Sequence, residues 1–192
     1  MKVNEIFYSL QGEGRNTGTP ATFIRLSGCN LRCPFCDTDF SQGKEMSDDE
    51  IIAEVIKKPA SLVVITGGEP SLQLTREFVE KLHQAHKYVA IETNGSHVIP
   101  DNVDWVTVSP KQSYVGEVGK NVLHQADEVK VVFDGINDIN DYSINARHYY
   151  VQPCDTGDEK KNKEIINQCI QFVKENPLWK ISLQTHKMLN VR

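Results

Sequence analysis

The chain has 192 residues, of which 39% are hydrophobic and 24% are charged, and its formal net charge at pH 7 is −5. This length and apolar content predict one compact domain over residues 1–192. The acidic balance, with no basic run, argues against a nucleic-acid partner. We also expect no signal peptide and no membrane span, and therefore a cytoplasmic protein.

Short runs of apolar and β-branched residues alternate with helical patterns along the chain. The runs that predict strands are residues 21–26, 62–66, 88–92, 105–108, 128–133, 148–151 and 180–183. Ser47 and Glu50 form a capping-box pattern at the start of a first helix, and apolar spacing predicts two more helices over residues 78–82 and 165–173. Cys169 lies on the apolar face of the last helix, so we expect a buried thiol there.

The order of these elements predicts the fold class. Strand–helix–strand alternation is typical of an α/β fold with a parallel sheet and right-handed crossovers. The chain is shorter than the roughly 250 residues of a complete eightfold barrel. Residues 93–104 also leave little room for a crossover, which needs about a dozen residues. We therefore expect an incomplete TIM-type barrel of about six parallel strands with about three well-formed helices.

Polar clusters rich in Gly and Pro follow five of the predicted strands. They are Thr66-Gly67-Gly68-Glu69-Pro70, Glu92-Thr93-Asn94-Gly95, Ser109-Pro110-Lys111, Gln152-Pro153-Cys154-Asp155 and Gln184-Thr185-His186-Lys187. A single cluster of this kind would be an ordinary turn. Because the carboxyl ends of parallel strands share one face, five clusters in step with the strands predict a common site.

Cys29, Cys33 and Cys36 are spaced so that three thiolates on a short loop can reach one metal centre. Structural zinc takes four ligands and iron–sulfur clusters usually take four cysteines, so a triad leaves one position open for a ligand. A zinc site completed by Cys154, Cys169 or a histidine is the alternative. A disulfide framework is less favoured, because five cysteines is an odd number.

This cysteine spacing, together with Gly67-Gly68-Glu69-Pro70, resembles the signature of radical S-adenosylmethionine enzymes. Three further motifs are more specific: Leu10-Gln11-Gly12-Glu13-Gly14, Cys36-Asp37-Thr38 and Leu183-Gln184-Thr185-His186-Lys187. With them, nearly the whole chain resembles the 7-carboxy-7-deazaguanine synthase family.

The resemblance implies a carbon–nitrogen lyase with a 4Fe-4S cluster, S-adenosylmethionine and Mg²⁺ as cofactors. The reduced cluster would cleave S-adenosylmethionine to a 5′-deoxyadenosyl radical, which abstracts hydrogen from C6 of 6-carboxy-5,6,7,8-tetrahydropterin. Ring contraction and loss of ammonia would then give 7-carboxy-7-deazaguanine, on the route to queuosine. The resemblance further implies a homodimer and reduction by flavodoxin or ferredoxin.

The resemblance also assigns roles to residues of the cofactor site. Cys29, Cys33 and Cys36 would ligate the cluster. The residues expected to bind S-adenosylmethionine are Phe35, Asp37, Gly68, Ser109, Pro110, Lys111, Gln152, Pro153, Cys154 and Asp155. Phe35 could instead be a hydrophobic cover, and Gly68 a tight turn. Cys154 stands where an apolar residue is expected, and is either a buried filler or a fourth ligand.

The expected substrate-binding residues are Leu10, Gln11, Gly12, Arg25, Thr66 and the main chain of Arg192. Arg25 suits a carboxylate because its guanidinium is planar and always charged, although it could form a surface salt bridge instead. The hydroxyl of Thr38 would hold Mg²⁺, with a hydrogen-bonded turn as the alternative. His186 is either close to the pterin or structural.

Two other functions remain open on the residues alone. An activase that makes a glycyl radical on a partner protein has the same cysteine spacing. A non-catalytic zinc module would use the triad with a fourth ligand. Metal analysis separates the zinc module from the synthase and the activase, because both of those would contain an iron–sulfur cluster with iron and acid-labile sulfide.

Overall fold

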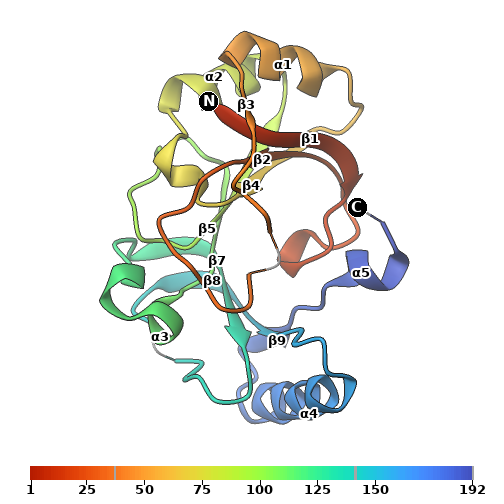
Figure 1. Cartoon of the computed structure of the whole chain (residues 1–192), viewed down its shortest axis with the longest axis vertical. Coiled ribbons are helices and arrows are strands. Elements are labelled where there is room, and N and C mark those ends of the chain that lie inside the picture. The colour runs from red at the N-terminus through yellow and green to blue at the C-terminus, as the bar shows by residue number, and fades with distance from the viewer. Residues whose placement is uncertain (37, 141, 192) are drawn as a thin grey trace.

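The computed structural model describes residues 1–36, 38–140 and 142–191. Two residues with expected roles, Asp37 and Arg192, lie outside the described residues. The centre of the fold is one curved sheet of nine strands in the order β3-β1-β2-β4-β5-β6-β7-β8-β9 (Figure 1).

The sheet is mixed. Its strands are β1 Lys2–Leu10, β2 Pro20–Leu26, β3 Lys44–Glu45, β4 Leu62–Gly67, β5 Tyr88–Thr93, β6 Trp105–Val108, β7 Gln125–Phe133, β8 Asn145–Pro153 and β9 Trp179–Ile181. The strands from β2 through β4 to β9 pair in parallel, whereas β1 and β3 are antiparallel additions at one edge. In the described residues no pairing joins the outer strands β3 and β9, so the prediction of an incomplete barrel is confirmed.

The seven parallel strands overlap the seven predicted runs, in agreement with the expected partial barrel of about six parallel strands. The last strand begins at Trp179 and ends at Ile181, two residues before the predicted end. Strand β1 was not predicted, because polar residues interrupt its apolar run. It nevertheless pairs with β2 over most of its length, from Val3 opposite Leu26 to Leu10 opposite Pro20.

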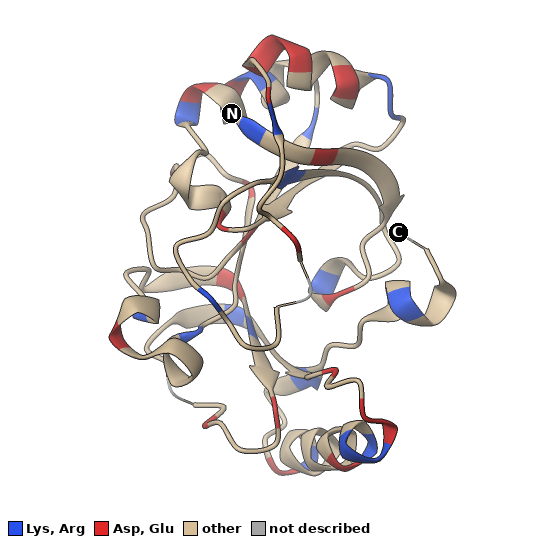
Figure 2. Cartoon of the chain, viewed as in Figure 1, with Lys and Arg blue, Asp and Glu red and all other residues tan. Residues whose placement is uncertain are grey.

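Three helices are well formed, as predicted: α1 Asp48–Ile56, α2 Arg76–Gln84 and α4 Glu159–Glu175. Two shorter helices are α3 Gln112–Val115 and α5 Thr185–Leu189, and short 3-10 turns lie at Gly14–Asn16, Pro70–Leu72 and Gly116–Gly119. The capping box is present, because Ser47 Oγ accepts from Glu50 N and the Glu50 carboxylate accepts from Ser47 N. The first turn of α1 is acidic, which suits a helix N-terminus (Figure 2). No helix in the described ranges is both long and apolar enough to cross a membrane.

The outer face of the sheet is covered by α1, α2 and α4. Ile24, Ile65 and Ile91 of the sheet pack in one buried cluster with residues of α1 and α2. A second cluster joins β7 and β8 to α4, and it includes Cys169, which is completely buried as expected.

The inner face alternates with the outer face at every second residue, as strands require. Phe23, Val64 and Ala90 form the inner apolar cluster, each one position before an outward isoleucine. Continuing the alternation towards the carboxyl ends of five strands brings one polar residue from each to the inner face. These residues are Arg25, Thr66, Glu92, Lys130 and Gln152.

Candidate active site

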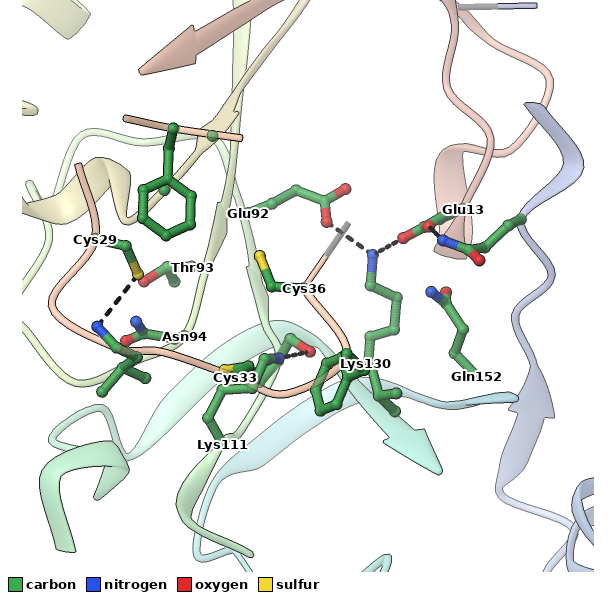
Figure 3. Close-up of a pocket in the computed structure, with 18 residues that line it drawn as sticks. Glu13, Cys29, Cys33, Cys36, Glu92, Thr93, Asn94, Lys111, Lys130 and Gln152 are labelled. Carbon is green, nitrogen blue, oxygen red and sulfur yellow. Dashed lines mark hydrogen bonds and ion pairs between the residues drawn. The ribbon is translucent and has the colours of Figure 1, made fainter. Parts of the chain in front are cut away.

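A cavity of about 220 Å³ lies at the carboxyl ends of the parallel strands. All three cysteines of the triad line it, on the loop that follows β2, and they face residues of β5 and β7 (Figure 3). The cavity wall consists of Glu13, Cys29, Leu31, Cys33, Phe35, Cys36, Phe40, Gly67, Gly68, Glu92, Thr93, Asn94, Ser109, Lys111, Lys130, Val132, Gln152 and Gln184.

Backbone hydrogen bonds fix the cysteine loop against the end of β4. Gly68 N donates to Leu26 O at 3.0 Å, and Glu69 N donates to Gly28 O at 2.9 Å. A Cβ atom at position 68 would lie 1.9 Å from Gly28 O, so only glycine permits this approach. Gly68 therefore shapes the start of the cysteine loop as well as lining the cavity.

The cysteine set fits a cluster that takes three protein ligands. Cys29, Cys33 and Cys36 are free thiols, and burial raises the pKa of Cys29 and Cys33. Iron coordination would deprotonate them. Within the described ranges, no three His, Cys, Asp or Glu side chains are placed to hold one metal ion. Three thiols in one cavity suit a centre that takes three protein ligands and keeps one position open.

The two other cysteines lie elsewhere. Cys169 is on the buried face of α4, and Cys154 is buried with its thiol 3.8 Å from Asp155 O. Neither is part of the cavity wall in the described structure. This placement favours the filler interpretation of Cys154 over a fourth ligand.

Of the residues expected to bind S-adenosylmethionine, five line the cavity: Phe35, Gly68, Ser109, Lys111 and Gln152. The Phe35 ring packs edge-on against Tyr114 with centroids 4.5 Å apart, and Lys111 Nζ lies 5.9 Å from the Phe35 centroid. Lys111 Nζ also donates to Ser109 O at 2.8 Å, and burial lowers the pKa of Lys111 to about 8.

Three further assignments, besides Cys154, are less directly placed. Pro110 and Pro153 are not among the described residues of the wall. Asp155 forms an ion pair with Lys187 at 3.3 Å and accepts from Asn162 Nδ2 at 2.8 Å. The roles of Pro110, Pro153, Cys154 and Asp155 towards the cofactor stay predictions.

A second, smaller cavity of about 110 Å³ adjoins the first. It brings together five of the residues expected to bind substrate, since its wall consists of Phe7, Leu10, Gln11, Gly12, Glu13, Phe23, Arg25, Val64, Thr66, Glu92 and His186. Glu13 and Glu92 line both cavities. These two residues therefore lie where the two cavities meet.

Arg25 both forms a salt bridge and lines the second cavity. Its Nε forms an ion pair with Glu5 Oε1 at 2.9 Å, and its Nη1 donates to Thr38 Oγ1 at 3.3 Å. The side chain is about a quarter exposed and also forms part of the second cavity. Arg25 is thus held by a carboxylate while it faces the cavity.

Thr38 lies where an oxygen ligand for Mg²⁺ would be useful. Asn4, Glu5, Arg25, Thr38, Asp39, Thr66 and His186 line a third, strongly polar cavity. Mg²⁺ prefers oxygen ligands and keeps several waters, so the hydroxyl of Thr38 fits this ion. Because the Arg25 guanidinium is in contact with Thr38, a cation there would need the anionic group of a ligand between the two.

Helix α5 closes one side of the second cavity. Thr185 N and Thr185 Oγ1 both donate to Gly12 O, at 3.0 and 2.9 Å. A Cβ atom on Gly12 would lie 2.2 Å from His186 Nδ1. Gly12 therefore allows α5 to approach, and His186 reaches the cavity wall.

The sequence motifs assign no individual role to several wall residues, chiefly Glu13, Glu92, Lys130 and Gln184. Glu13, Glu92 and Gln184 stand inside motifs that were already noted. The available signal for Lys130 was a charged residue in an otherwise apolar strand, at an inward position between Val129 and Val131. The Lys130 ammonium forms ion pairs with Glu92 at 2.7 Å and with Glu13 at 2.5 Å (Figure 3).

Comparison with known proteins gives consistent results. The family model of the radical SAM superfamily matches residues 23–145. A 7-carboxy-7-deazaguanine synthase of Bacteroides thetaiotaomicron is 51% identical over 192 residues, covering 100% of this chain and 98% of the relative. The synthase of Haemophilus influenzae is 37% identical over 98% of this chain and 93% of its own length.

A solved structure agrees with these relatives. The crystal structure of QueE from Escherichia coli aligns with a TM-score of 0.73 and 26% identity, over 95% of this chain and 92% of that chain. The chain belongs to the radical SAM superfamily and, within it, to the 7-carboxy-7-deazaguanine synthase family.

Proposed function

We propose that this enzyme converts 6-carboxy-5,6,7,8-tetrahydropterin to 7-carboxy-7-deazaguanine with loss of ammonia, on the route to queuosine. The observation that carries the proposal is the pair of adjoining cavities, one with three thiols and the other with Arg25. This arrangement suits a radical cofactor beside a small carboxylated substrate. The names of the relatives support the same reaction.

In the first cavity, Cys29, Cys33 and Cys36 would hold a 4Fe-4S cluster. When bound, the cluster and S-adenosylmethionine together supply a carbon radical that removes a hydrogen atom from the substrate. The chain's own contribution is position and charge. Gly68 permits close approach of a ligand, while Lys111 offers an ammonium to a carboxylate or hydroxyl.

In the second cavity, Arg25 would bind the substrate carboxylate. Gln11 and the main chain of Leu10 and Gly12 would hydrogen-bond to the edge of the pterin, with Thr66 beside them. Thr38 would provide a hydroxyl ligand to Mg²⁺, and the ion would supply positive charge for the substrate carboxylate. The main chain of Arg192 is proposed to complete the pocket.

The proposal extends to partners and location. Flavodoxin or ferredoxin would reduce the cluster, and two copies of the chain would form a homodimer. The cytoplasm is the proposed location, because cysteines there are kept reduced.

An anaerobic assay tests the reaction. Reconstituted enzyme receives S-adenosylmethionine, Mg²⁺, dithionite and 6-carboxytetrahydropterin, and the product is identified by mass spectrometry. We expect 7-carboxy-7-deazaguanine from the wild type and from Cys169→Ala, whose thiol lies outside the site. Cys33→Ala should lack both the cluster and the product.

A different outcome would redirect the assignment. Cleavage of S-adenosylmethionine without 7-carboxy-7-deazaguanine would retain the radical mechanism and reject the substrate. Zinc without iron or sulfide in the reconstituted protein would reject the radical mechanism itself.

A further inference from the structure

The boundary between the two cavities is formed by a pair of acidic side chains held by one lysine. Glu13 follows β1 and Glu92 lies on β5, and of the described residues only these two line both cavities. Lys130, on β7, lines the first cavity and contacts both carboxylates (Figure 3). Its side chain is only 4% exposed.

Each oxygen of the two carboxylates has a specific partner. Lys130 Nζ binds Glu13 Oε2 and Glu92 Oε2. Glu13 Oε1 accepts from Gln184 Nε2 at 3.0 Å, and Glu92 Oε1 accepts from Gln11 Nε2 at 2.9 Å. The lysine and the two amides therefore fix the rotation of both carboxylates.

Two partly buried carboxylates that contact the same ammonium group would repel each other if that cation were removed. Burial acts to raise the pKa of Glu13, but the charge and hydrogen bond of Lys130 outweigh it and lower that pKa to about 2. The other charged or titratable groups that act on Glu13 or its partners are His186 from α5, Lys111 after β6 and Glu128 on β7.

We propose that Lys130 is a positioning residue, which keeps Glu13 ionised and holds the Glu13 and Glu92 carboxylates in a fixed orientation at the boundary of the two cavities. The carboxylates then accept hydrogen bonds from N–H groups of a heterocyclic ligand whose carboxylate is bound by Arg25. The ligand class rests on the proposed function, whereas the effect of Lys130 on the carboxylates does not.

The first test measures stability against pH on the full-length holoenzyme, kept anaerobic. The variants are Lys130→Met, Lys130→Arg and the control Lys87→Met, whose lysine ammonium donates to the main-chain oxygens of Lys58 and Ala60. A carboxylate with a pKa of about 2 stays ionised between pH 5.5 and 8.5, so Glu13 adds no pH dependence to the wild type there.

Without the ammonium, burial raises the pKa of Glu13 above its unfolded value, so stability decreases as the pH rises and the group must ionise. We expect the melting temperature of Lys130→Met to fall further below wild type at pH 8.5 than at pH 5.5. Lys130→Arg should retain most of the wild-type profile, and Lys87→Met should show an offset that does not vary with pH. A pH-independent offset for Lys130→Met would overturn the proposal.

The double variant Glu13→Gln/Lys130→Met keeps the proposal testable if Lys130→Met alone does not fold. It also distinguishes the contribution of Glu13 to the pH dependence from that of Glu128, whose pKa the charge of Lys130 lowers as well. Removing the Glu13 charge should restore part of the melting temperature and reduce its pH dependence. An unchanged pH dependence, or no recovery of folding, would show that Glu13 is not the group that Lys130 controls.

The second test measures binding of pterin-6-carboxylate by calorimetry at pH 7.5. We expect Lys130→Met to bind about tenfold more weakly, because truncating one member of a buried charged network leaves its partners unpaired. Lys87→Met should bind as the wild type does. Failure of the wild type to bind this analogue would reject the assigned class of ligand, a heterocyclic carboxylate, and the pH experiment would still decide the role of Lys130.

Discussion

Thr93 Oγ1 donates a 2.6 Å hydrogen bond to Glu69 Oε1 and so joins the end of β5 to the loop after β4. The same carboxylate accepts from Asn94 N at 2.7 Å and from Ser71 N at 3.0 Å. Glu69 is only 1% exposed and is not among the described residues of the cavity wall. The acidic residue of Gly67-Gly68-Glu69-Pro70 is thus a buried connection between two loops that do line the cavity.

Replacing Glu69 by alanine should destabilise the protein strongly. The hydroxyl of Thr93 and the main-chain amides of Ser71 and Asn94 would lose their acceptor, at an expected cost of about 3 kcal/mol or more. Thr93→Val is the comparison variant, since it removes one donor to Glu69 and the acceptor of Gly95 N, and it should cost about 1–2 kcal/mol. Denaturant unfolding of both variants measures the difference. Equal losses would show that the carboxylate is not the centre of this network.

Gly68→Ala should prevent assembly of the iron–sulfur cluster. The new Cβ atom would lie 1.9 Å from Gly28 O, so either the end of β4 or the start of the cysteine loop must move. Iron and sulfide content after reconstitution is the measurement. Gly18→Ala is the control, because its φ of +84° also strains a side chain but nothing lies within 4 Å of the added Cβ. Full cluster content in Gly68→Ala would disprove the steric argument.

Arg25→Lys should weaken binding of the carboxylated ligand about tenfold, because a lysine retains the charge but cannot form two parallel hydrogen bonds. The contacts to Glu5 and Thr38 would change as well, since they use two different guanidinium nitrogens. Calorimetry with pterin-6-carboxylate measures the effect. Arg76→Lys, on the half-exposed surface of α2, provides the comparison and should leave affinity unchanged. Identical affinities in both variants would remove Arg25 from the substrate site.

Glu128→Gln should stabilise the protein at alkaline pH. Burial raises the pKa of Glu128 to about 7, so the folded state holds a proton that the unfolded state releases near pH 4.5. Stability of the wild type therefore falls as the pH rises through this interval, and the variant lacks that loss. Glutamine can still accept from Arg15 N, which lies 3.0 Å from Glu128 Oε2.

The size of this effect follows from the shift in pKa. The unfolding free energy of Glu128→Gln should exceed that of the wild type by roughly 2–3 kcal/mol at pH 8 and by little at pH 5. Urea unfolding at the two pH values provides the measurement, with Glu54→Gln on α1 as a control. A gain that is the same at both pH values would contradict ionisation as its cause.

The parallel strands and the cysteine triad could be predicted because their signals are local. A strand of the core needs only a short apolar run, and the runs ending at Leu26, Thr66 and Glu92 lie within the observed strands β2, β4 and β5. Cys29, Cys33 and Cys36 are close in space because they are close along the chain. The edge strand β1 escaped prediction because its pairing with β2, rather than an apolar run, holds it in place.

By itself, the sequence determined the α/β class, the triad and the face on which the polar clusters gather, since each follows from spacing within a few residues. The tertiary structure decided which of the polar residues meet. Lys130 and Glu13 are 117 residues apart, and Gln184 and Glu13 are 171 residues apart, yet each pair forms a contact. Such contacts exist only after the whole sheet has curved and α5 has packed on Gly12, because no local pattern specifies which inward side chains will be opposite each other.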